Sequence, residues 1–113
     1  MYLALLIIPV PAQNLEAYRI WARQSVDIFR RYGCIEVLDG GEDAVPKGSR
    51  PDFFRAVEAR PDEKIVVSCQ LWPDRETLAA AEAQMHADHA LDYDGEPPFD
   101  PSRLIMGCFR DLG

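Results

Sequence analysis

Residues 2–10 read Tyr-Leu-Ala-Leu-Leu-Ile-Ile-Pro-Val, an unbroken apolar run of strand length. A strand with one face in water alternates apolar and polar side chains, whereas apolar residues at successive positions are typical of a strand buried on both faces. Residues 64–72, Lys-Ile-Val-Val-Ser-Cys-Gln-Leu-Trp, and residues 104–109, Leu-Ile-Met-Gly-Cys-Phe, have the same character. These three runs predict strands of one sheet that needs cover on both sides.

Two helices are predicted between these strands. Leu15–Tyr32 carries apolar side chains at spacings of three and four, with Asn14 as the expected N-cap and Gly33 as a left-handed stop. Arg75–His89 is dense in Ala, Glu, Gln and Met, which are strong helix formers, and Asp74 precedes it as a good cap. Each helix is long enough to lie across a small sheet.

Two further strands are predicted in the middle of the chain. Cys34–Asp39 alternates and ends at a glycine pair, and Phe53–Ala59 also has strand character. A turn after Phe53–Ala59 leads into residues 64–72, so we expect a hairpin there. The acidic, proline-containing segment Asp92–Pro101 is expected to be an irregular connection.

This order of elements predicts the fold class. It is an α+β protein with a ferredoxin-like βαββαβ antiparallel sheet, two helices on one face and an extra hairpin strand, in one domain over residues 1–113. Two helices can cover only one face of the sheet. The other face has a flat area on the order of 400 Å², which is large for an apolar patch on a monomer. We therefore expect a homodimer that buries the sheet faces against each other.

Charge and cysteine usage limit the partners. The chain has 12 basic and 19 acidic residues, a net charge of −7, which argues against nucleic acid and membrane surfaces as partners. Cys34, Cys69 and Cys108 are far apart and form no disulfide framework or metal pattern. We expect free thiols in a reducing compartment and a cytoplasmic location. The first apolar run lacks a basic flank and is too short to span a bilayer.

Several short motifs are shared with a known family: Val10-Pro11, Asn14-Leu15, Ala17-Tyr18-Arg19, Phe54-Arg55-Ala56-Val57, the strand from Glu63 to Ser68, Trp72-Pro73 with Arg75, Pro98-Phe99-Asp100, Arg103, and Gly107 with Phe109. On these motifs the sequence resembles the YbaA-like family (DUF1428) of small bacterial proteins over nearly its whole length. The family is similar to the dimeric α/β-barrel superfamily, so the resemblance implies a back-to-back sheet dimer and brings no established activity. The sequence departs from the family at residues 87–90, where an Asp-Pro-Arg-like turn is usual.

Four side chains are candidates for ligand binding. Tyr18, Trp21 and Trp72 could line a cavity between the helices and the sheet, although aromatic residues more often simply pack in a core. Arg55 stands among apolar residues, where a guanidinium could hold a small anionic ligand. The alternative for Arg55 is a salt bridge to one of the many acidic residues.

His86 and His89 are further candidates because they lie three residues apart on the second predicted helix. They could provide two ligands of a metal site, or one of them could act as a general base. The spacing places no third zinc ligand, so no metal is predicted, and two solvated histidines at a helix end are the alternative.

Three classes of function remain open. The first is a small-molecule-binding module of unknown role. The second is a small enzyme without a cofactor, monooxygenase- or isomerase-like, that uses Arg55 with a histidine or a tyrosine. The third is a protein-interaction subunit. Haem-degrading relatives in the superfamily pair a helix histidine with a strand tryptophan and a strand asparagine; residues 2–10 contain no asparagine, so no cofactor is predicted.

Overall fold

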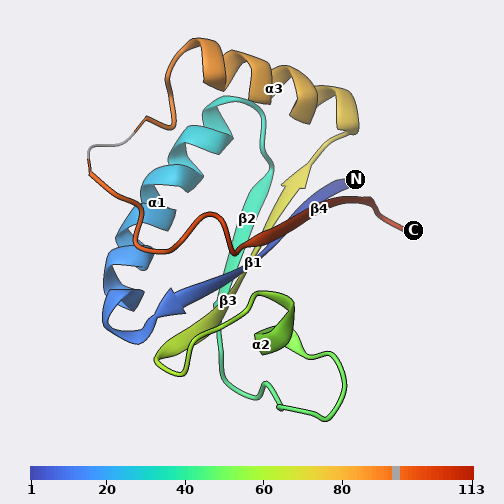
Figure 1. The fold of residues 1–113 in the computed structure, drawn as a ribbon. Helices are drawn as coiled ribbons and strands as arrows, with labels where there is room; N and C mark the ends of the chain where they lie inside the picture. Colours follow the sequence, from blue (N-terminus) through green and yellow to red (C-terminus); the bar gives the residue numbers. More distant parts are fainter. Residues whose placement is uncertain (93–94) are drawn as a thin grey trace.

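The computed structural model describes residues 1–92 and 95–113 (Figure 1). Its elements in chain order are β1 (Tyr2–Pro11), η1 (Ala12–Asn14), α1 (Leu15–Arg31), β2 (Glu36–Gly41), α2 (Phe53–Ala56), β3 (Glu63–Trp72), α3 (Arg75–Ala87) and β4 (Ile105–Arg110). Residues 93 and 94, part of the segment expected to be irregular, lie outside the described residues.

The four strands form one sheet in the order β2-β3-β1-β4. Every neighbouring pair is antiparallel, and β1 pairs with β3 along its whole length, from Tyr2 opposite Trp72 to Pro11 opposite Glu63. β1 therefore lies between two strands from later in the sequence, which is the ferredoxin-like arrangement. The predicted fold class is confirmed.

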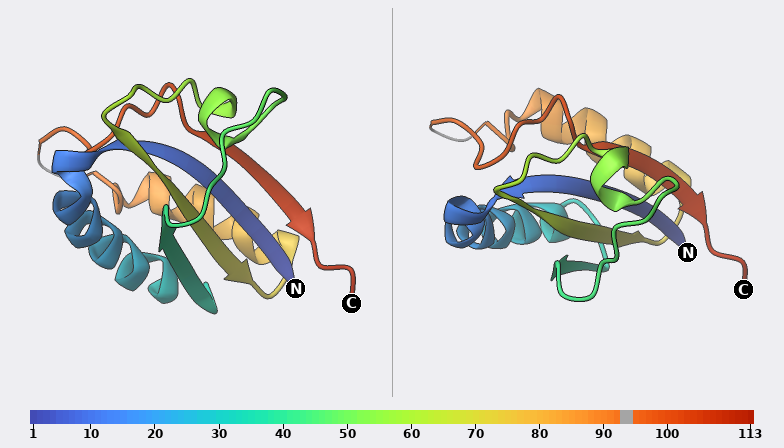
Figure 2. Two further views of the ribbon diagram at one scale, coloured as in Figure 1. Left: turned by 90° about the horizontal axis from the view of Figure 1, so that it is seen from below. Right: turned by 60° about the horizontal axis from the view of Figure 1, so that its bottom comes forward.

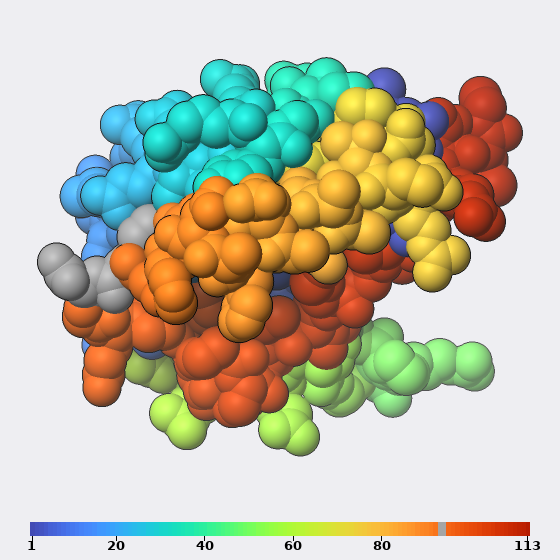
Figure 3. Space-filling view, turned by 90° about the horizontal axis from the view of Figure 1, so that it is seen from above, coloured from blue at the N-terminus to red at the C-terminus, as the bar shows by residue number. Residues whose placement is uncertain are grey.

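Both long helices pack on the same face of the sheet (Figure 2). Seen from above in Figure 3, α3 lies beside the later part of α1. The buried residues of two adjoining clusters come from alternate positions of β1 and β3 and from the inner sides of the helices: Ala4, Ile8, Val10, Val66, Trp72, Tyr18, Ala22, Ile28, Leu78, Ala81 and Met85, with Cys34 and Phe99 from the connections. The molecule measures 40 × 38 × 21 Å. A thickness of 21 Å accommodates one sheet and one helical layer about 10–12 Å across.

The helix ends follow the predictions in part. The Asp74 carboxylate caps α3 by accepting the N–H of Thr77 at 2.7 Å, and Gly33 ends α1 with a φ of 108°. Asn14 does not cap α1 through its side chain: the 3₁₀ turn η1 precedes the helix, and the Asn14 amide instead donates to the Pro98 carbonyl at 3.2 Å. No helix in the described part of the chain is long and apolar enough to cross a membrane.

The predicted extra strand at Phe53–Ala59 is wrong. The structure has a single helical turn there, α2, because the Asp52 carboxylate accepts the N–H of Arg55 at 2.8 Å and the Asp52 carbonyl accepts that of Ala56 at 3.0 Å. β2 occupies the edge of β3 with which a hairpin strand would have to pair. Local capping therefore determines the conformation, and the described sheet keeps four strands.

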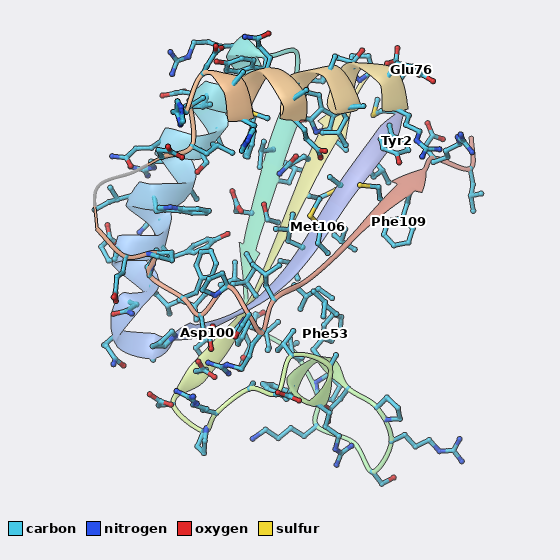
Figure 4. The ribbon with its side chains drawn as sticks, turned by 45° about the horizontal axis from the view of Figure 1, so that its top comes forward. Tyr2, Phe53, Glu76, Asp100, Met106 and Phe109 are labelled. Atoms are coloured by element: carbon cyan, nitrogen blue, oxygen red, sulfur yellow. The ribbon has the colours of Figure 1, made fainter. Side chains whose placement is uncertain are left out.

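The face of the sheet away from α1 and α3 is apolar and partly open. We call it the helix-free face; by register its apolar residues are Leu3, Leu5, Ile7, Pro9, Ile65, Val67, Cys69, Leu71, Leu38, Ile105 and Phe109, and Glu36 and Glu63 lie at its margins. Leu38 is 55% exposed and Phe109, labelled in Figure 4, is 52% exposed. Only at the end near α2 are side chains of this face, Pro9 and Ile65, fully buried. The chain thus shields one face and a corner of the other.

Candidate functional site

A cavity of about 110 Å³ lies between α1, the helix-covered face of the sheet and residues 98–104. The cavity arises from the side chains of α1 that face the sheet. Those near the two ends of the helix are bulky, whereas Ala22 and Ser25 in the middle are small and leave space above the strands. Its lining is Leu6, Ile8, Tyr18, Trp21, Ala22, Ser25, Val26, Phe29, Val37, Asp39, Ser68, Gln70, Phe99 and Leu104. The walls are mainly apolar, with a few polar groups at the strand side, which is the usual composition of a small-molecule site.

Tyr18 and Asp39 form the first polar contact in the cavity wall. The Tyr18 hydroxyl donates to Asp39 Oδ1 at 3.2 Å, joining α1 to the edge strand β2. Burial and the neighbouring Asp39 carboxylate raise the pKa of Tyr18 well above its ordinary value, and a hydrogen bond from Ser68 opposes that rise. The Tyr18 phenol therefore stays protonated at neutral pH and acts as a donor.

Gln70 supplies a second polar group with a fixed orientation. Its Oε1 accepts the indole N–H of Trp72 at 3.0 Å. Because the indole nitrogen can only donate, the amide must turn its oxygen toward Trp72 and its NH₂ group the other way. Gln70 is 9% exposed and lines the cavity. Its NH₂ group is therefore available to donate to an oxygen atom of a ligand.

Aromatic rings close the opposite wall. The rings of Trp21 and Phe99 meet edge to face with centroids 5.2 Å apart, and Phe99 meets Tyr18 at 6.0 Å. Such edge contacts fix ring positions as well as burying area. Two hydrogen bonds hold the segment that carries Phe99: Asn14 donates to the Pro98 carbonyl, and Arg103 Nε donates to Asp100 Oδ2 at 3.1 Å.

The structure brings Tyr18 and Trp21 together at this cavity, and it places Trp72 elsewhere. Trp72 is fully buried in the core between the sheet and α3, where its ring packs edge to face on Phe29 at 6.5 Å. It does not line the cavity, but it contacts two lining residues, Phe29 through its ring and Gln70 through the indole N–H. Trp72 is thus a residue that orients a lining side chain.

Arg55 lies on α2 and does not line the cavity. Its side chain is 56% exposed, with Nη1 at 3.5 Å from Asp52 Oδ2, and the same nitrogen donates to the Arg50 carbonyl. The salt bridge considered as the alternative for Arg55 is present.

His86 and His89 are both exposed at the end of α3, and neither lines the cavity. His89 Nδ1 is 3.0 Å from Asp92 Oδ2. Within residues 1–92 and 95–113, no three His, Cys, Asp or Glu side chains are grouped so that they could hold a metal ion.

A charged cluster of Arg103, Glu63 and Asp100 is a feature that the sequence did not reveal. Arg103 donates to both carboxylate oxygens of Glu63, at 2.6 and 2.5 Å, and to the Glu58 carbonyl at 3.0 Å. The side chains of Arg103 and Glu63 are 11% and 2% exposed. Hydrogen bonds from Arg103 lower the pKa of Glu63, and those from Ser102 and Arg103 lower the pKa of Asp100 to about 2. All the donors face carboxylates or carbonyls of this chain, so the cluster fixes the segments that precede β3 and β4.

The sequence also missed Asp39 and Gln70 as lining residues. A usable signal was present in β3, where Ser68 and Gln70 are polar residues at alternate positions of an otherwise apolar strand. Alternate residues share one face of a strand, so both had to face the same layer. In the structure Ser68 is a hydrogen-bonding neighbour of Tyr18.

The topology and the cavity together define a class: small α+β proteins with a ferredoxin-like sheet and a cavity between the sheet and a helix. Residues 1–101 match the family described as "Protein of unknown function (DUF1428)", and the chain belongs to this family.

The relatives agree with this assignment. The chain is 33% identical to the uncharacterized protein YbaA of Escherichia coli K12 over 107 residues, which is 94% of this chain and 92% of that protein, and it matches YbaA of Shigella flexneri equally. Among solved structures, the de novo designed protein Foldit4 covers 97% of both chains at 15% identity with a TM-score of 0.47.

Proposed function

We propose that this protein is a homodimeric small-molecule-binding protein whose ligand site is the cavity under α1. The observation that carries the proposal is the cavity itself, in which apolar and aromatic walls surround oriented hydrogen-bonding groups at Tyr18, Ser68 and Gln70. Protein interiors are normally close-packed, so unfilled space beside three polar side chains is not expected of a core that only stabilises the fold.

The ligand proposed for the cavity is uncharged. Among the described residues no Lys or Arg lines it, and Asp39 is the charged residue in its wall. An anion in the cavity would be repelled by that carboxylate and would find no compensating cation among the described lining residues. An anionic ligand at Arg55 would occupy a different, exposed place on α2.

Filling the cavity tests the proposal. The substitution Ala22→Leu adds three carbon atoms at a buried lining position of α1, and Ala17→Leu makes the same change at an exposed position of the same helix. We expect 1-butanol, titrated into the millimolar range, to shift the NMR signals of lining residues in the wild type and in Ala17→Leu, and to lose this effect in Ala22→Leu. Equal responses of the two variants would refute the site.

The homodimer is supported by the helix-free face. β1 and β3 are ten residues long, so the four strands present a face on the order of 500 Å² in projection, before side-chain relief is added. A standard interface buries about 800 Å² of accessible surface on each partner. A second copy offers a mainly apolar face of the same size, and two-fold pairing is the commonest closed assembly.

The dimer is tested by light scattering, with twice 12.8 kDa as the expected mass. Leu38→Asp places a charge on the helix-free face, and Ile20→Asp places one at a similarly exposed position, 53% against 55%, on the outer side of α1. We expect Leu38→Asp to dissociate the dimer and Ile20→Asp to preserve it. A wild-type monomer at micromolar concentration would refute the proposal.

A second candidate is a cofactor-free enzyme that moves a proton through Tyr18. Ser68, Tyr18 and Asp39 form a hydrogen-bonded series that ends at an exposed carboxylate. A carbonyl compound held by Gln70 would lie beside this series. The test is exchange of the α-hydrogens of 2-butanone in D₂O: faster exchange with the wild type than with Tyr18→Phe or Asp39→Asn would support the enzyme, and exchange at the rate in buffer would exclude it.

The proposed location is the cytoplasm. Cys34, Cys69 and Cys108 are free, and Cys108 is exposed, which suits a reducing compartment. Fractionation of cells followed by immunodetection would test this location, and recovery with a secreted fraction would contradict it.

A further inference from the structure

A second hollow adjoins the cavity on its outer side. It measures about 310 Å³ and is open to solvent, and we call it the outer groove. Its lining is Trp21, Leu91, Gly95, Glu96, Pro97, Phe99, Pro101 and Leu104. Leu91, Phe99 and Leu104 together with the two prolines make it a mainly apolar surface channel.

The cavity and the outer groove share one wall. Trp21, Phe99 and Leu104 line both hollows, so each of these side chains has one surface toward the cavity and another toward the groove. The two spaces are therefore separated by a single layer of side chains. Trp21 and Leu104 are half-buried, so neither side chain is sealed in the core.

The volumes indicate how the two hollows are used. A cavity of 150 Å³ holds benzene in another protein, so 110 Å³ corresponds to roughly four non-hydrogen atoms. Small-molecule sites usually measure about 300–1,000 Å³. The cavity alone falls below that range, and the cavity with the 310 Å³ outer groove falls within it.

The polar groups are distributed unevenly along this path. The inner end has the Gln70 amide, the Ser68 hydroxyl and the Tyr18–Asp39 pair, whereas the middle is aromatic. Among the described lining residues, the charged ones are Asp39 at the inner end and Glu96 at the outer end. A carboxylate or phosphate head would meet a like charge at either end, so the head group that fits is neutral and contains an oxygen acceptor for Gln70.

From this arrangement, and resting on the proposed function of the cavity, we propose that the two hollows form one site for an elongated neutral amphiphile. Its hydroxyl or carbonyl head lies at Gln70 and Ser68. Its hydrocarbon chain passes Trp21, Phe99 and Leu104 and lies along Leu91 in the outer groove. The class of ligand is a medium-chain alcohol, ketone or aldehyde.

A homologous series of probes tests the proposal. Dissociation constants are measured by NMR titration for 1-butanol, 1-hexanol and 1-octanol with the wild type, with Leu91→Gln and with the control Leu112→Gln. Leu91 lines only the outer groove, and Leu112 is fully exposed near the end of the chain. We expect each added pair of methylene groups to tighten binding about tenfold in the wild type and in Leu112→Gln, and to tighten it much less in Leu91→Gln.

The outcomes separate this inference from the proposed function. If 1-butanol binds in a manner that Ala22→Leu abolishes but longer alcohols bind no more tightly, the elongated site is refuted and the cavity site remains. A gain with chain length that persists in Leu91→Gln also refutes the elongated site, because the chain then lies elsewhere. If none of the alcohols binds, both proposals fail.

Discussion

Replacing Arg103 with leucine removes the cation from the charged cluster and leaves the Glu63 carboxylate buried without it. Loss of one partner from a buried ion pair costs about 3–5 kcal/mol. Arg103 keeps 11% of its side chain exposed, so we expect the lower end of that range, about 3 kcal/mol. For a chain of 113 residues this corresponds to a fall in Tm of roughly 10–15 °C, measured by circular dichroism at pH 7.

Arg55→Leu is the matched control for that experiment. It removes the cation from a second arginine–carboxylate contact, in which Arg55 is 56% exposed, and exposed pairs contribute about 0–1 kcal/mol. The double variant Glu63→Leu/Arg103→Leu should be more stable than Arg103→Leu alone, because it leaves no unpaired buried charge. Equal losses of stability in Arg103→Leu and Arg55→Leu would refute the reasoning.

The stabilisation that is lost in Arg103→Leu should also depend on pH. Arg103 lowers the pKa of Glu63, and the pKa of Asp100 is about 2. A carboxyl group with a lowered pKa stabilises the folded state above its unfolded pKa of about 4, and that contribution is lost as the pH falls through the folded value. The stability difference between wild type and Arg103→Leu should therefore shrink from pH 5 toward about pH 2. A difference that stays constant over this range would show that the cluster does not act through its charges.

Three further predictions concern separate parts of the molecule. Cys34 is buried and burial raises its pKa, whereas Cys108 is exposed, so a thiol reagent followed by mass spectrometry should modify Cys108 first; early labelling of Cys34 would contradict the fold. Asp74→Ala removes the cap of α3 and should cost about 1 kcal/mol in urea unfolding, and an unchanged midpoint would show that the cap is dispensable. Gly33→Ala should cost about 1–3 kcal/mol, because the residue has a φ of 108° and a Cβ there would lie 3.1 Å from Thr77 Cγ2; a neutral result in the same assay would contradict the left-handed geometry.

The fold was predictable because its main signals are strong and mutually consistent. The run that became β1 is apolar along its length, β3 is apolar at most of its positions, and α1 has a clear apolar stripe. Element bounds shifted by one or two residues, as at β2, which begins at Glu36 where Cys34 was expected. The strand prediction for Phe53–Ala59 failed because a short apolar segment contains too few residues for its periodicity to distinguish a strand from a helical turn. The Asp52 cap favours the helical turn.

The site was predictable only on its helical side. Tyr18 and Trp21 lie on one predicted helix, whose spacing shows that they face the same layer. Asp39 comes from the edge strand and Gln70 from a central one, and which strand lies over which part of α1 depends on sheet order and register. Arg103 and Glu63 are 40 positions apart, and nothing local in either segment indicates that they meet. Contacts of this kind are properties of the tertiary structure.

The position of β1 has a consequence for how the molecule is made. The first strand of the chain is held by β3 and by β4, and Tyr2 lies opposite Arg110 near the other terminus. During synthesis the apolar strand β1 emerges before β3 and β4, so it remains unpaired until both of its neighbours have been made. Folding dominated by such distant pairings is slow, so a nascent chain of this protein should depend on chaperones for longer than a helical bundle of equal length.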